Sequence, residues 1–140
     1  FVGVAALLHV GIGLRSWSRY AVAGIAVPPD VRVPLWTVSG MALLGGVVLA
    51  ATRPWLRRPL YAAGAFLNAG YVVAYFSWHA SGHRSLLPVG NVDLHGVPLV
   101  EFLVDHALAG PVEFVALVAE LGAVALLVVL LRVDSVPEAR

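Results

Sequence analysis

The chain has 140 residues, of which 60% are hydrophobic and only 12% are charged. A soluble domain of this length needs a charged exterior, so the composition excludes an ordinary soluble domain and indicates an integral membrane protein. The formal net charge of +1 provides no basic surface for nucleic acid, and the lack of cysteine excludes disulfides, thiolate metal sites and iron-sulfur clusters.

Four apolar segments follow one another along the chain. A bilayer core of about 30 Å requires roughly 20 apolar residues in a helix. Segments 33–52, 59–79 and 111–132 meet this length, whereas the first, 1–14, is shorter and ends at "RSWSRY". We expect the first segment to be the exit half of a transmembrane helix whose start is missing. None alternates like a barrel strand, so the sequence predicts an all-α integral membrane protein, a four-transmembrane-helix bundle in a single domain.

The long connection between the third and fourth segments contains one further predicted element. Residues 98–108 form a short apolar stretch that starts with Pro98 and ends before the break at Gly110 and Pro111. Proline in a first turn and glycine after a last turn are typical of helix ends. We therefore predict a short interfacial helix in this loop.

Arginine density provides the expected orientation in the cell membrane. Arg53, Arg57 and Arg58 lie together in the short loop between the second and third segments. Because cytoplasmic loops are enriched in basic residues, we expect this loop to be cytoplasmic and the histidine-rich loop to face outward.

The third and fourth segments each carry a stripe of polar residues. Glu120 lies nine residues after Pro111, near mid-bilayer, and a carboxylate there requires a partner or a proton. Glu113, seven residues earlier, shares its face, although an acid in the first turn can also be a simple cap. We expect a polar pocket between the two segments that opens outward, lined by Asn68, Tyr71, Tyr75, His79, Glu113 and Glu120. The alternative is that these groups only specify helix packing.

Histidines and carboxylates are the available strong metal ligands. His79 and His83 have the i, i+4 spacing with which two imidazoles grip one ion, whereas His95 is expected to be a loop residue. The candidate ligands for zinc, copper or non-haem iron are His9, His79, His83, His106, Glu101 and Asp105. Haem held by His9 with His79 or His106 is a less supported alternative.

Three functions remain open from the sequence. The first is a non-enzymatic membrane component or accessory subunit, with the lipid bilayer, a second copy or a larger membrane complex as partners. The second is a redox protein that binds a metal or haem. The third is a proton-coupled carrier that uses Glu120, which would require a dimer to enclose a path.

Overall fold

The protein is described here by a computed structural model, which covers residues 1–81 and 97–134. Within these two ranges all regular structure is helical, so the all-α prediction is confirmed. In chain order the elements are α1 (Val2–Val22), α2 (Arg32–Thr52), the 3-10 turn η1 (Pro54–Leu56), α3 (Arg57–Ala80), α4 (Leu99–Ala107) and α5 (Pro111–Val133).

Helix α1 extends well beyond the apolar segment predicted to end at Leu14, because polar residues alone do not end a helix. Arg15 and Arg19 are exposed on its surface, and the helix continues to Val22. The chain then turns at Gly24, whose φ of 74° lies in the left-handed region that glycine adopts without strain. Hydropathy therefore identified the apolar part of α1 but not its end, which lies just before Gly24.

The other helices begin where the sequence provides a start signal. Before α2, a carboxylate oxygen of Asp30 accepts the backbone N–H of Arg32 at 3.0 Å, which satisfies one of the amides that a helix start leaves unpaired. Proline occupies the first turn of α5 at Pro111, directly after extended Gly110. Proline fits there because its missing N–H would be unpaired anyway.

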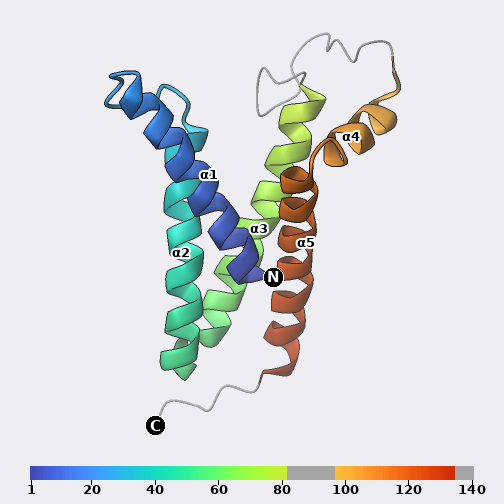
Figure 1. Ribbon diagram of the computed structural model, residues 1–140. Helices are drawn as coiled ribbons and strands as arrows, with labels where there is room; N and C mark the ends of the chain where they lie inside the picture. The colour runs from blue at the N-terminus through green and yellow to red at the C-terminus, as the bar shows by residue number, and fades with distance from the viewer. Residues whose placement is uncertain (82–96, 135–140) are drawn as a thin grey trace.

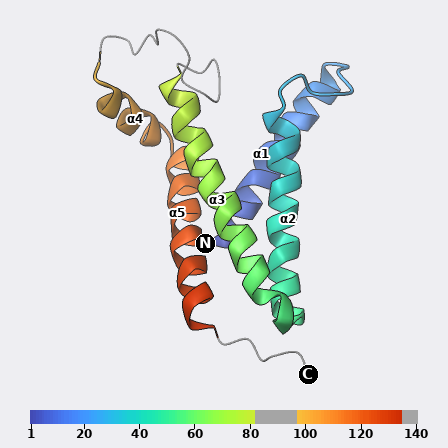
Figure 2. The ribbon, with the colours of Figure 1, turned by 180° about the vertical axis from the view of Figure 1, so that it is seen from behind.

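The long helices form two antiparallel pairs. Helix α1 packs mainly on α2, and α3 packs mainly on α5; the two pairs meet through α1 with α5 and α2 with α3. Figures 1 and 2 show that the pairs converge toward one end and diverge toward the end that carries α4, which lies beside α3 and α5. We call these the arginine end, after Arg53, Arg57, Arg58 and Arg132, and the α4 end.

Glycine brings the backbones of the first pair together. A Cβ added at Gly40 of α2 would lie 2.7 Å from the carbonyl oxygen of Ala6 and 2.8 Å from the backbone nitrogen of Val10, both in α1. At Gly13 of α1, an added Cβ would collide with Thr37 of α2. Small residues at a helix crossing are typical of membrane helices, whose association relies on close van der Waals packing.

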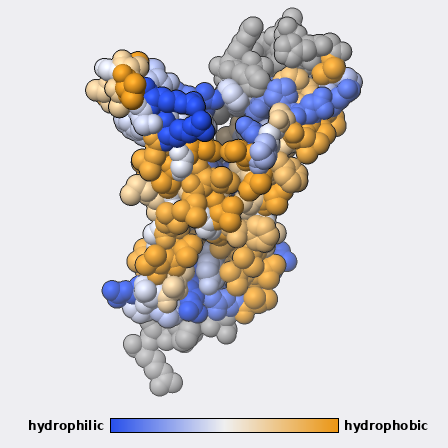
Figure 3. Space-filling view, viewed as in Figure 1, coloured by the Kyte–Doolittle hydropathy of each residue, from blue (hydrophilic) through white to orange (hydrophobic). Residues whose placement is uncertain are grey.

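The surface between the two ends is apolar. Figure 3 shows a broad hydrophobic band with hydrophilic residues above and below it, and large side chains such as Phe66 (82% exposed) and Val38 (67%) point outward from it. In the described part of the chain, three helices are long and apolar enough to cross a membrane: Arg32–Thr52, Pro54–Ala80 and Pro111–Val133. This surface fits an integral membrane protein.

Candidate functional site

A buried contact between the first and the last long helix is the centre of the candidate site. Nε2 of His9 in α1 lies 2.8 Å from Oε1 of Glu120 in α5. The two residues are only 3% and 4% exposed. Glu120 therefore has the partner that a buried carboxylate requires, and that partner comes from α1 rather than from the neighbouring α3.

A second, partly buried bond joins the pairs beside the first. The ring of Tyr71 in α3 lies against the His9 ring, with centroids 4.1 Å apart, and its hydroxyl is 2.6 Å from the hydroxyl of Ser39 in α2. Ser39 donates its only proton to the carbonyl of Leu35 at 2.6 Å, so Tyr71 is the donor to Ser39. All four long helices thus contribute to one group of polar residues, which we call the polar layer: His9, Ser39, Asn68, Tyr71 and Glu120.

Part of the hydrogen-bonding capacity of this interior is not used by the described residues. Asn68 is fully buried, and its amide donates to the carbonyl of Gly64 at 2.7 Å. Its Oδ1, Nδ1 of His9 and the hydroxyl of Tyr75 are buried without a hydrogen-bond partner in the described part of the chain. Buried polar atoms are normally paired, so these three atoms have hydrogen-bonding capacity that the described residues do not use.

Two further histidines meet near the α4 end. The rings of His79 in α3 and His106 in α4 have centroids 5.0 Å apart. Nδ1 of each donates to a carbonyl one turn earlier in its own helix, that of Tyr75 and of Phe102, both at 2.8 Å. A carbonyl only accepts, so the proton of each neutral ring is on Nδ1.

The histidines therefore divide into two groups instead of forming one cluster at a single depth. His79 lies eight residues after Tyr71, the residue on which His9 stacks, and eight helical residues span about 12 Å. His9 belongs to the polar layer, whereas His79 and His106 belong to the α4 end. A haem bridged by His9 and either of them is not favoured by this separation.

The other predicted metal ligands are spread out. Glu101 and Asp105 are exposed on α4, and His83 lies outside the described residues. Among residues 1–81 and 97–134, no group of three or more His, Asp or Glu side chains comes together as a metal site. Metal binding thus stays a prediction without support from this part of the molecule.

The two glutamates of α5 have different surroundings despite their shared face. Glu113 is exposed in the first turn, and its carboxylate folds back over Gly110, where an added Cβ would collide with Oε2. That position fits the alternative in which Glu113 is only a cap at the start of α5. Glu120 is buried in the polar layer with His9. Of the predicted pocket residues, Tyr71 and Glu120 meet around His9. Asn68 is buried one turn before Tyr71 in α3, and Tyr75 and His79 follow one and two turns after it.

Ser39 is the residue of the polar layer that the sequence analysis missed. Its hydroxyl could be satisfied within its own helix, as it is by Leu35, and nothing local in the sequence indicates a second bond to Tyr71. The available signal was weak: a serine between Val38 and Gly40, inside an otherwise apolar segment and next to a glycine that permits close packing.

Polar contacts also link helices at each end. At the arginine end, the hydroxyl of Tyr61 donates to Asp134 at 2.9 Å, and Arg57 lies 3.9 Å from the same carboxylate. At the α4 end, the Arg32 guanidinium lies 4.4 Å from the ring centroid of Trp78 in α3. It also bonds Asp30 at 2.7 Å, and this hydrogen bond holds the pKa of the Asp30 carboxyl below its usual value.

The apolar band and its three helices of membrane-spanning length fit a helical integral membrane protein. No protein-family model, curated protein or solved structure matches the chain. Its function is therefore inferred from its own residues.

Proposed function

We propose that the protein is a four-span, non-enzymatic component of the cell membrane. Helix α1 has 21 residues, packs antiparallel on the apolar α2, and carries His9 in its apolar half. These features support α1 as a fourth span beside the three longer apolar stretches. The arginine end, with Arg53, Arg57 and Arg58, is the cytoplasmic side, because basic residues are retained there.

The observation that carries the proposal is the 2.8 Å contact between His9 and Glu120. It joins the first pair of helices to the second, and the bond between Ser39 and Tyr71 does the same beside it. In this function the polar layer holds the two pairs in a defined arrangement, which presents the apolar exterior to lipid, to a second copy or to a larger membrane complex. Interhelical hydrogen bonds in membranes contribute about 1 kcal/mol each and specify which helices meet.

A matched pair of variants tests this function. Glu120→Gln keeps a group that can bond to His9 but cannot bind or release a proton, whereas Glu120→Leu removes the bond as well. A component whose polar layer only joins helices tolerates Gln and is destabilised by Leu, as measured by thermal unfolding in detergent. Equal stability of all three proteins would contradict the proposal. Purification in mild detergent, followed by mass determination, then distinguishes a monomer, a homo-oligomer and a subunit of a larger complex.

A proton-coupled carrier is the second candidate. The unused hydrogen-bonding capacity of His9, Asn68 and Tyr75 beside a buried carboxylate favours it, since ionisable groups inside a membrane often mark proton paths. The test is proton flux into proteoliposomes under an imposed pH gradient. Flux that Glu120→Gln abolishes without loss of stability would establish the carrier, and absence of flux in the unmodified protein would remove it.

A further inference from the structure

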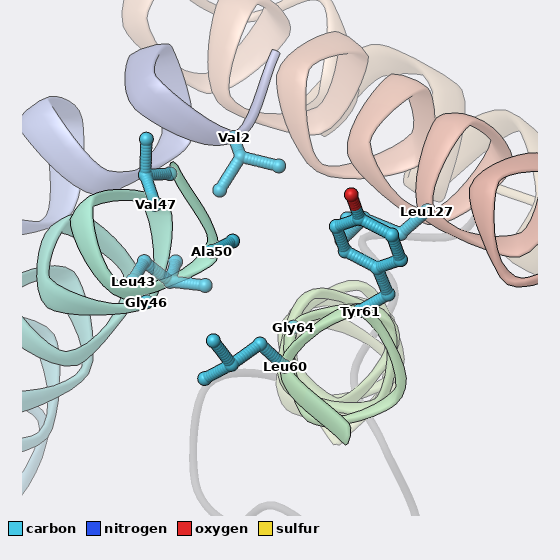
Figure 4. Close-up of a pocket in the computed structure, with 9 residues that line it drawn as sticks. All are labelled: Val2, Leu43, Gly46, Val47, Ala50, Leu60, Tyr61, Gly64 and Leu127. Carbon is cyan, nitrogen blue, oxygen red and sulfur yellow. The ribbon is translucent and has the colours of Figure 1, made fainter. Parts of the chain in front are cut away.

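A small apolar cavity lies between the two helix pairs, toward the arginine end. Its volume is about 60 Å³, and Figure 4 shows its lining side chains converging from all four long helices. Two of its lining residues, Gly46 of α2 and Gly64 of α3, contribute no side chain to it. The lining residues are Val2, Leu43, Gly46, Val47, Ala50, Leu60, Tyr61, Gly64 and Leu127.

The cavity is open on one side, and its walls are hydrocarbon. Val47, in its lining, is 47% exposed, so the opening lies on the lateral surface of the apolar band. A narrow space of this kind suits a segment of an unbranched hydrocarbon chain, which can lie along it without leaving any polar group unpaired.

The end of the cavity nearest the connection between α2 and α3 is polar and basic. The guanidinium of Arg57 donates to the carbonyl of Ala50, a lining residue, at 3.1 Å, and the lining residue Tyr61 bonds Asp134. Asp134 compensates part of the charge of Arg57. Arg53 and Arg58, which are exposed, leave the arginine end with an excess of positive charge over the described carboxylates.

We infer that this place binds one anionic phospholipid of the cytoplasmic leaflet. A segment of one acyl chain occupies the cavity, and the phosphate lies at the arginine end against Arg53 and Arg58. The charge complementarity and the adjacent hydrocarbon-lined space together identify the occupant, because basic pockets between membrane helices bind anionic headgroups. This inference rests on the proposed membrane orientation, and it depends on neither the subunit nor the carrier function.

The test compares lipids that differ only in headgroup. The full chain is purified in neutral detergent, and its unfolding temperature is measured with added phosphatidylglycerol or phosphatidylcholine of identical acyl chains. Specific binding at saturating lipid is expected to raise the unfolding temperature by about 5 °C with phosphatidylglycerol, and less with phosphatidylcholine. Glycerol phosphate without acyl chains is expected to have no effect. An equal rise with both phospholipids would overturn the inference.

Matched variants assign the two parts of the site. Gly46→Leu places a side chain in the cavity, whereas Gly45→Leu places one where an added Cβ meets nothing within 4 Å. The first should abolish the phosphatidylglycerol effect and the second should preserve it. Arg53→Gln combined with Arg58→Gln should remove the preference for the anionic headgroup. If Gly46→Leu does not fold, native mass spectrometry of the arginine variant provides the test by counting the lipid that co-purifies with it. Retention of phosphatidylglycerol at the level of the unmodified protein would overturn the inference.

Discussion

His9 and Glu120 are 111 residues apart in the chain, yet their side chains meet at 2.8 Å in the interior. The consequences of removing either partner are unequal. His9→Ala leaves a buried carboxyl that must either stay charged without a partner or take up a proton, whereas Glu120→Ala leaves an imidazole that is able to remain neutral. Breaking a buried pair in the first way costs about 3 kcal/mol, so we expect His9→Ala to reduce the free energy of unfolding more than Glu120→Ala does.

The double variant provides the control for this asymmetry. Once His9 is alanine, adding Glu120→Ala removes the unpaired carboxylate and should recover part of the lost stability. Chemical unfolding of the four proteins in the same detergent measures the coupling between the two sites. Strictly additive losses would show that the contact does not contribute to stability.

The bond between Ser39 and Tyr71 predicts a smaller effect. Ser39→Ala and Tyr71→Phe should each reduce stability by about 1 kcal/mol, and the double variant should lose little more than either one, because both remove the same bond. Thr52→Val is the matched control, since among the described residues the Thr52 hydroxyl bonds within its own helix, to Val48. Coupling of Tyr71→Phe to Thr52→Val as large as its coupling to Ser39→Ala would disprove this assignment.

Because α1 packs closely on α2, two glycine substitutions are predicted to change the stability in opposite directions. Alanine is favoured over glycine within a helix by about 1 kcal/mol, so Gly11→Ala, where an added Cβ meets nothing within 4 Å, should be neutral or stabilising. Gly40→Ala would force the new methyl group against the backbone of α1 and should destabilise by about 1 to 3 kcal/mol. Thermal unfolding of both variants checks this contrast, and a stabilised Gly40→Ala protein would refute the close approach.

The ion pair of Asp30 with Arg32 predicts a pH dependence at the α4 end. The pKa of Asp30 is lowered by its hydrogen bond to Arg32, against a usual value of 3.8. Stabilisation by this carboxylate is therefore present above pH 3.8 and is lost as the pH falls through the lower folded-state pKa. Asp30→Asn should reduce stability at pH 7, by no more than about 1 kcal/mol because the pair is partly exposed.

The same substitution should have a diminishing effect as the pH is lowered. Below the folded-state pKa of Asp30 the carboxyl is protonated in both states, so the difference in unfolding temperature between the variant and the unmodified protein should shrink in acid. Thermal unfolding at pH 7 and at pH 3 tests this direction. A difference that grows on acidification would contradict it.

Helical class and three apolar spans were predictable because they depend on local composition. The partner of Glu120 could not be predicted, although its need for a partner could. Periodicity placed Glu120 on a face toward α3, but α1 and α5 also meet in the fold, and His9 reaches the carboxylate from there. Which helices become neighbours depends on packing between distant segments, as at Gly40, and a single sequence contains no local signal for it.

The place of His9 in the first helix has a consequence for biogenesis. In the proposed four-span arrangement, α1 and α2 are synthesised well before α5, so the first pair of helices enters lipid with an imidazole that has no carboxylate beside it. When α5 arrives, Glu120 pairs with His9. Separating α1 from α5 afterwards would expose these two polar groups to hydrocarbon. In that arrangement, a ribosome that stalls before Glu120 releases a chain in which the bond between Ser39 and Tyr71 still joins α2 to α3, but the contact between His9 and Glu120 is missing.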